Sequence, residues 1–214
     1  MNSKLVFCLA LLLGILGLVV PLVFGPDLSA TPVHPPEQES GGVQKFDVDP
    51  VHSSILFRVK HLEVSYFYGR FKEVSGSFQV DENNPAKSTI ALKVSAESVD
   101  SNSEGRDRHL KSQDFFSAKE FPFISFKSTK IEKAGENAYR VTGDLTYRGV
   151  TRSIRFQAEH TGTASVSPRF GLRSGYEAIL DIKRSDFGDT YGIKDKVLSD
   201  ALRLIISIEG MPAS

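Results

Sequence analysis

Apolar and polar residues alternate along most of the chain after residue 45, so that every second side chain is hydrophobic. Because successive side chains of a β-strand point to opposite faces, this period of two predicts strands with one buried and one solvated face. Eight segments follow the pattern: 55–60, 76–80, 90–97, 124–128, 141–148, 154–159, 176–183 and 202–209. The chain is therefore predicted to be all-β, with eight antiparallel strands.

The connections between these segments carry turn residues. The shortest one, 148–151, predicts a hairpin that pairs the strands on either side of it. Two segments break the period of two. Residues 62–68 are expected to be irregular or helical, and the polar stretch 102–116, which is rich in good helix formers, is predicted to be a short helical insertion.

An open sheet of eight strands would leave two unpaired edges, and closure into a barrel removes them. An eight-stranded barrel is either filled by its own side chains or holds one small ligand. Small residues on the inward face favour a cavity, and they stand at Gly76, Ala96, Gly143, Ala158 and Ala178. A β-sandwich with a solid core would show the same alternation, so the pattern leaves both architectures open.

The first 45 residues differ from the rest. Residues 5–24 are an uncharged apolar run behind Lys4, so we predict an N-terminal hydrophobic helix in residues 1–24, either a signal peptide or a membrane anchor. Residues 25–45 are rich in Pro and Gly and are predicted to be a linker. In either case the strand-rich domain, 46–210, is expected to be exported, since Lys4 marks the cytoplasmic side.

The charges narrow the choice of partners. The chain has 26 basic and 26 acidic residues, a formal net charge of zero. This balance argues against an overall electrostatic nucleic-acid binder, so no nucleic acid is expected as a partner. The single cysteine, Cys8, lies in the apolar run, which excludes thiol chemistry from the domain.

Candidates for chemistry are few. None of the five histidines forms a pair with the spacing typical of zinc ligands, and no nucleophile, phosphate-loop or dinucleotide motif occurs, so neither a metal nor a catalytic residue is predicted. The densest polar cluster is residues 106–109, Arg-Asp-Arg-His. It is either a solvated helix face or a polar rim that meets a ligand headgroup.

Several short motifs, in order, resemble the YceI-like family. They are residues 46–53 (FDVDPVHS), 69–71 (GRF), 106–110 (RDRHL), 114–116 (DFF), 143–152 (GDLTYRGVTR) and 184–188 (RSDFG). The resemblance covers residues 46–209. It implies a lipocalin-like antiparallel barrel, usually periplasmic, that binds polyisoprenoids such as isoprenoid quinones or polyprenyl phosphates without catalysis. No cofactor beyond such a lipid is expected.

The resemblance gives the inward positions a role, because a polyprenyl chain is held mainly by burial of apolar surface. The residues expected to line its cavity are Phe57, Val59, Phe78, Leu92, Val94, Phe126, Leu145, Phe156, Leu180, Leu204 and Ile206. The residues expected at a polar mouth, or in structural contacts, are His52, His61, Arg106, Asp107, Arg108 and His109.

Other functions remain open at this point. A lipid-modifying enzyme could use His52 or His109 as its base, and an envelope stress or interaction module could have a solid core. The sequence also leaves open whether residues 5–24 tether the domain to the inner membrane and whether the protein is a homodimer.

Overall fold

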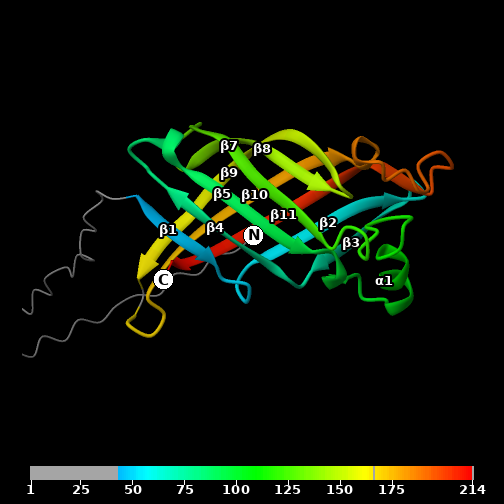
Figure 1. Ribbon diagram of the computed structural model, residues 1–214, viewed down its shortest axis with the longest axis horizontal. Helices are drawn as coiled ribbons and strands as arrows, with labels where there is room; N and C mark the ends of the chain where they lie inside the picture. Colours follow the sequence, from blue (N-terminus) through cyan, green and yellow to red (C-terminus); the bar gives the residue numbers. More distant parts are fainter. Residues whose placement is uncertain (1–42, 166, 214) are drawn as a thin grey trace, which may run out of the picture. The chain divides into compact units, whose positions relative to one another are not determined.

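The computed structural model describes residues 43–165 and 167–213, so the predicted N-terminal helix and the linker up to residue 42 lie outside the described residues. The described chain consists mostly of strands (Figure 1). They are β1 (Gln44–Val48), β2 (Ser54–His61), β3 (Ser65–Phe71), β4 (Val74–Val80), β5 (Thr89–Ser95), β6 (Val99–Asp100), β7 (Phe123–Lys133), β8 (Ala138–Tyr147), β9 (Val150–Ser165), β10 (Leu172–Lys183) and β11 (Leu198–Pro212). The described helices are α1 (Glu104–Leu110) and the 3₁₀ turns η1 (Pro85–Lys87), η2 (Ala96–Ser98) and η3 (Arg184–Phe187).

Eight strands form a closed antiparallel barrel. Their order is β1-β4-β5-β7-β8-β9-β10-β11, and the ring closes because β1 pairs with both β4 and β11. β2 continues along the edge of β11 that β1 occupies at residues 210–212, and pairs with residues 198–207. β3 and β6 then extend this wall on the side of the molecule where α1 lies (Figure 1).

Alternation explains the core. Along β8, buried residues alternate with residues that are exposed or half-buried, and the buried ones are Tyr139, Val141, Gly143, Leu145 and Tyr147. The other barrel strands place their apolar faces inward in the same way, so that one continuous hydrophobic cluster lines the inside of the barrel. The predicted barrel is confirmed, and so is the hairpin, in which Tyr147 pairs with Val150.

All eight predicted strands are present, as β2, β4, β5 and β7–β11, but the ring contains β1 in place of β2. β1 begins at Gln44, inside the segment predicted to be the linker. Its first two residues, Gln44 and Lys45, are polar and exposed. Short polar ends of this kind resemble linker in a sequence and become strand only through pairing with β4.

The prediction that residues 62–68 are irregular or helical is wrong. Only residues 62–64 form a turn, and β3 begins at Ser65. Leu62 and Glu63 adopt left-handed φ angles of 48° and 57°, which close the turn between β2 and β3. β3 then pairs with β2 from Ser65 to Phe71. Residues 66–68 of β3 are all aromatic, so hydrophobic and polar residues do not alternate there and the sequence gives no period of two.

The helical insertion is confirmed but is shorter than predicted, because α1 ends at Leu110. The following turns hold Phe115 and Phe116 buried against the barrel. The side chain of Arg148, from the β8–β9 hairpin, donates hydrogen bonds to the carbonyls of Gln113 and Phe115 and fixes this segment. Among residues 43–165 and 167–213, no helix has the length and hydrophobicity needed to cross a membrane.

Replacing Gly76 with alanine should lower the free energy of unfolding by about 3 kcal/mol. Gly76 has a φ of 138°, and a Cβ atom there would lie 2.1 Å from the backbone oxygen of Ala91 on β5. Urea unfolding would measure the loss. Gly105→Ala is the matched control, because the nearest atom to its Cβ is 3.8 Å away, and it should cause no loss. Equal stability of the two variants would contradict the prediction.

Candidate functional site

In the part of the chain that the structure describes, a row of cavities runs through the barrel, and three of them matter for the site. We name them the tyrosine-end cavity, which Tyr139 and Tyr176 line, the central cavity, and the α1-end cavity, which Arg106 and His109 line. Their volumes are about 100, 80 and 480 Å³. The structure therefore agrees with a hollow barrel and not with a solid core.

Shared side chains separate neighbouring cavities. Five residues line both the tyrosine-end and the central cavity: Leu92, Phe126, Leu145, Leu204 and Ile206. Four line both the central and the α1-end cavity: Phe57, Phe116, Tyr147 and Leu202. The tyrosine-end and α1-end cavities share no lining residue, which gives the linear order.

Each residue predicted to line a ligand cavity lies on the wall of at least one of these three. Phe78, Phe156 and Leu180 line the tyrosine-end cavity, and Val94 lines the central one. Val59 lines the α1-end cavity. The remaining six predicted residues belong to the two shared sets: Phe57, Leu92, Phe126, Leu145, Leu204 and Ile206. Their contact with a ligand stays a prediction.

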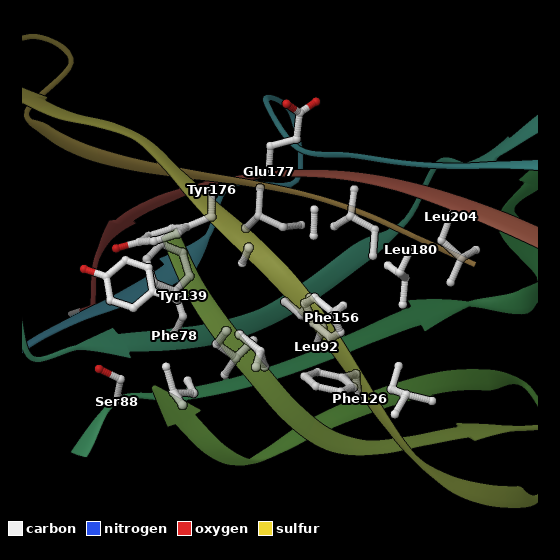
Figure 2. Close-up of a pocket in the computed structure, with 18 of the residues that line it drawn as sticks. Phe78, Ser88, Leu92, Phe126, Tyr139, Phe156, Tyr176, Glu177, Leu180 and Leu204 are labelled. Atoms are coloured by element: carbon white, nitrogen blue, oxygen red, sulfur yellow. The ribbon is translucent and has the colours of Figure 1, made fainter. Parts of the chain in front are cut away.

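Aromatic side chains close the tyrosine end. The rings of Tyr139 and Tyr176 have centroids 6.2 Å apart, and Tyr176 also packs against Phe78 at 5.4 Å. Figure 2 shows both tyrosines at one end of this cavity, with Leu180, Leu204 and Phe126 at the other. Burial, with the neighbouring Tyr139 adding to it, raises the pKa of Tyr176 well above its usual value. The hydroxyl is therefore neutral at physiological pH and suits an apolar cavity.

The α1-end cavity has a more polar wall. It brings together His61, Arg106 and His109, three of the residues predicted at a polar mouth. Arg106 donates hydrogen bonds to the side chain and the carbonyl of Ser101, and its guanidinium lies 4.2 Å from the Phe67 ring centroid. His109 Nε2 lies 2.7 Å from Asp114 Oδ2. Hydrogen-bonding groups thus face this cavity from β2 and α1.

A buried ion pair lies in the wall of the α1-end cavity. Arg184 Nη1 donates to Asp189 Oδ1 at 2.6 Å, and both side chains are almost fully buried. The Tyr147 hydroxyl donates to the other carboxylate oxygen at 2.8 Å. Burial raises the pKa of Asp189, and Arg184 and Tyr147 oppose that rise. Burial and the negative charge of Asp189 raise the pKa of Tyr147 well above its usual value.

The other three predicted polar residues lie apart from this cavity. His52 is in the β1–β2 turn beside Asp49. Asp107 accepts hydrogen bonds from the backbone and side chain of Ser101, which fixes the loop before α1. Arg108 is exposed on α1. The structure thus separates the cluster at residues 106–109 into cavity-lining Arg106 and His109 and two residues that face elsewhere.

The comparison with known families identifies the fold. The model of the YceI-like domain matches residues 46–210, more than half of the chain. The chain belongs to the YceI-like family. This YceI-like protein is 41% identical over 167 residues to a UPF0312 protein of Photorhabdus laumondii, covering 78% of this chain and 85% of that protein. A UPF0312 protein of Yersinia enterocolitica is 39% identical over 169 residues, covering 79% and 86%.

Solved structures share the barrel. A Campylobacter jejuni YCEI protein is 32% identical to this YceI-like chain with a TM-score of 0.64, covering 72% of this chain and 90% of that one. Burkholderia cenocepacia BcnA has a TM-score of 0.70 at 24% identity, covering 77% and 99%. A polyisoprenoid binding domain from Saccharophagus degradans has a TM-score of 0.62 at 16% identity, covering 80% and 100%. The last two likenesses concern the fold alone.

His52 of this YceI-like protein belongs to a charge-matched cluster. Atoms of Asp49, His52 and Glu209 that could hold a metal lie within 4.8 Å of one another. His52 Nδ1 is 2.9 Å from Asp49 Oδ2, and Arg173 Nε is 3.1 Å from Glu209 Oε1. The two carboxylates therefore already have cationic partners from the protein, His52 when it is protonated and Arg173.

Replacing Asp49 with asparagine should lower the pKa of His52. The hydrogen bond with Asp49 holds the pKa of His52 above 6.5, and the same bond holds that of Asp49 below 3.8. A raised histidine pKa stabilises the fold below pH 6.5, and this contribution disappears as the pH rises through the raised value. The contribution of Asp49 is present above pH 3.8 and disappears as the pH falls through its lowered value. NMR titration of His52 measures the change.

Glu209→Gln is the control for this titration. Its Oε1 lies 3.9 Å from His52 Nδ1, beyond hydrogen-bond distance, so the pKa of His52 should fall by less than in Asp49→Asn. An unchanged His52 titration in Asp49→Asn would show that the hydrogen bond is not what shifts it.

Sequence reasoning missed several lining residues of this YceI-like protein. Tyr139 stands two residues before Val141, so the same alternation could have found it. Phe116, Arg184, Asp189 and Tyr191 lie in turns, where a period of two gives no signal. Arg184 belongs to the motif at residues 184–188, but the motif does not indicate that Arg184 pairs with Asp189.

Proposed function

We propose that the protein binds an isoprenoid lipid, a polyprenyl phosphate or an isoprenoid quinone, inside the barrel and carries it without catalysis at the cell envelope. The observation that carries this proposal is the row of cavities. Two cavities with apolar walls lead to a third with hydrogen-bonding groups. A long hydrocarbon chain with one polar end has the matching distribution of chemistry.

The direction of the ligand follows from the same row. Its chain would occupy the tyrosine-end and central cavities, and its headgroup would lie near His61, Arg106 and His109. Arg184 is paired with Asp189, and His109 lies beside Asp114. Within residues 43–165 and 167–213, the hydrogen bonds of Arg106 reach only neutral oxygens of Ser101, so its positive charge is available to phosphate or carbonyl oxygens.

Binding requires side chains to move. A cavity of about 150 Å³ accommodates benzene, so the inner cavities are too small for a polyprenyl chain as they stand. The side chains that separate them are hydrophobic, with Phe126 and Leu145 among them. Rotation of such side chains would join the two cavities. The hydrocarbon chain of the lipid would then take the place of the apolar side-chain contacts that are lost.

A solved structure with the same fold supports the ligand class. The Saccharophagus degradans domain is called polyisoprenoid binding, and it has this fold. For this chain we place the domain outside the cytoplasm, in the periplasm, with residues 5–24 either tethering it to the inner membrane or removed as a signal peptide. The uncharged run and Lys4 support this location.

Mass spectrometry of an organic extract tests the function. The full-length protein, purified under native conditions from its own host, should release a polyprenyl lipid in a constant molar ratio. The ligand class would be wrong if the extract held no such lipid and the protein took up no added polyprenyl phosphate or quinone.

A second measurement addresses catalysis. His109→Ala removes the histidine that lines the α1-end cavity, and His52→Ala removes the one in the β1–β2 turn. A carrier should return the bound lipid chemically unchanged with either variant and with the parent protein. If the parent protein converted an added lipid and one of the variants did not, the protein would be a lipid-modifying enzyme and not a carrier.

A further inference from the structure

The α1-end cavity has an unusually apolar rim for an exposed part of a protein. Leu62 is 53% exposed and Val64 is 84% exposed, both in the β2–β3 turn. Tyr66 and Tyr191, which line the cavity below, are 53% and 43% exposed. We call these four residues the apolar rim.

The fold holds the rim in place. The backbone N–H of Leu62 donates to the carbonyl of Val197 at 2.9 Å, which ties the β2–β3 turn to the loop that carries Tyr191. Leu62 keeps a left-handed φ of 48°, a conformation that leucine rarely adopts. The strained turn therefore presents a large apolar side chain to solvent where Gly or Asn would serve the backbone better.

The composition around the rim matches a lipid–water interface. Tyrosines are enriched at that level of a bilayer, and apolar side chains enter its outer region. Lys60 at the end of β2 and Lys194 and Lys196 in the loop stand against Glu63 and Asp195. Asp189 in the same loop is neutralised by Arg184, so a small positive excess remains, which suits anionic phospholipid. Aliphatic, aromatic and basic side chains thus occur together at the opening of the polar cavity.

The chain before β1 is long enough for this end to reach a membrane. Residues 25–43 span about 60 Å when fully extended. The 15 residues of β11, which line the α1-end cavity at Leu198 and the tyrosine-end cavity at Ile208, span about 50 Å. An anchor in residues 5–24 would therefore allow either end of the barrel to face the same bilayer.

We propose that the apolar rim docks on the surface of an anionic phospholipid bilayer, so that a lipid passes between the bilayer and the α1-end cavity. This inference rests on the proposed function, because it supplies the path that the bound lipid would take. Leu62 and Val64 enter the outer part of the bilayer, Tyr66 and Tyr191 lie at its interface, and the lysines face the phosphate groups.

Site-specific fluorescence tests the docking in the full-length chain. Cys8→Ser removes the natural cysteine, and Val64→Cys then carries an environment-sensitive NBD label. With vesicles of phosphatidylethanolamine and phosphatidylglycerol, the label at 64 should shift its emission to shorter wavelength. The control is Val51→Cys in the β1–β2 turn, the same residue type at 81% exposure, whose label should not shift. No shift at 64, or equal shifts at both positions, would overturn the proposal.

Lipid transfer gives a second readout of the docking. Val64→Asp should slow transfer of a fluorescent polyprenyl lipid from these vesicles about tenfold, because it puts a charge at the membrane surface. Val51→Asp should not slow it. If the emission at 64 shifted without vesicles as the protein concentration rises, a second copy of the chain would cover the rim. That result would contradict the proposal. Recovery of a lipid in the extract without docking at 64 would leave the function standing and refute the docking. Docking at 64 without any lipid in the extract would leave the docking standing and refute the proposed function.

Discussion

Replacing Asp189 with alanine should lower the free energy of unfolding by about 3–5 kcal/mol, because it leaves a buried guanidinium without its counter-ion. The Arg184 and Asp189 side chains are 4% and 2% exposed, so the carboxylate is the nearby charge that compensates a largely desolvated guanidinium. The Tyr147 hydroxyl loses its acceptor in the same variant. Urea unfolding at neutral pH gives the free energy directly.

A double variant distinguishes the cost of an unpaired buried charge from the net contribution of the ion pair. Arg184→Met with Asp189→Leu replaces both ions by apolar groups, and such replacements are often neutral or stabilising, so most of the loss should be recovered. Asp186→Ala is the matched control, since Asp186 is exposed in the 3₁₀ turn that holds Arg184, and it should change stability by less than about 0.5 kcal/mol. A similar small change in Asp189→Ala would mean that the pair contributes little.

The strands were predictable because each needs only local information. A residue such as Val141 is buried and its neighbour Arg140 is exposed, and this contrast is written in the sequence itself. Pairing partners are not written there. β1 and β2 share one edge of β11, and which of them closes the ring depends on long-range register.

The cavity walls were predictable for the same reason, and the buried ion pair between Arg184 and Asp189 was not. Inward positions follow from alternation, so Leu180 and Leu204 could be placed on the interior face. Nothing local indicates that Arg184, a charged residue in a turn, points inward to meet Asp189 five residues later. Such a pair becomes visible only when the turn folds over the end of the barrel.

Filling the tyrosine-end cavity should weaken lipid binding roughly tenfold without unfolding the protein. Ala178 is buried on β10, faces this cavity and is flanked by Ala158 and Ile206 on the neighbouring strands. In Ala178→Leu the longer side chain takes up space that the lipid chain needs. Loss of about 60 Å² of ligand contact at about 25 cal/mol per Å² is about 1.5 kcal/mol, or roughly tenfold in affinity.

The same substitution on the outer face provides the control. Ala91 is exposed on β5, so Ala91→Leu adds an identical side chain outside the barrel and should leave the lipid content unchanged. Quantifying lipid per mole of protein, together with urea unfolding, distinguishes a blocked cavity from a damaged fold. The ligand would have to lie elsewhere if Ala178→Leu were as stable as the parent and kept its full lipid content, because this cavity accommodates either the leucine or the chain of the lipid.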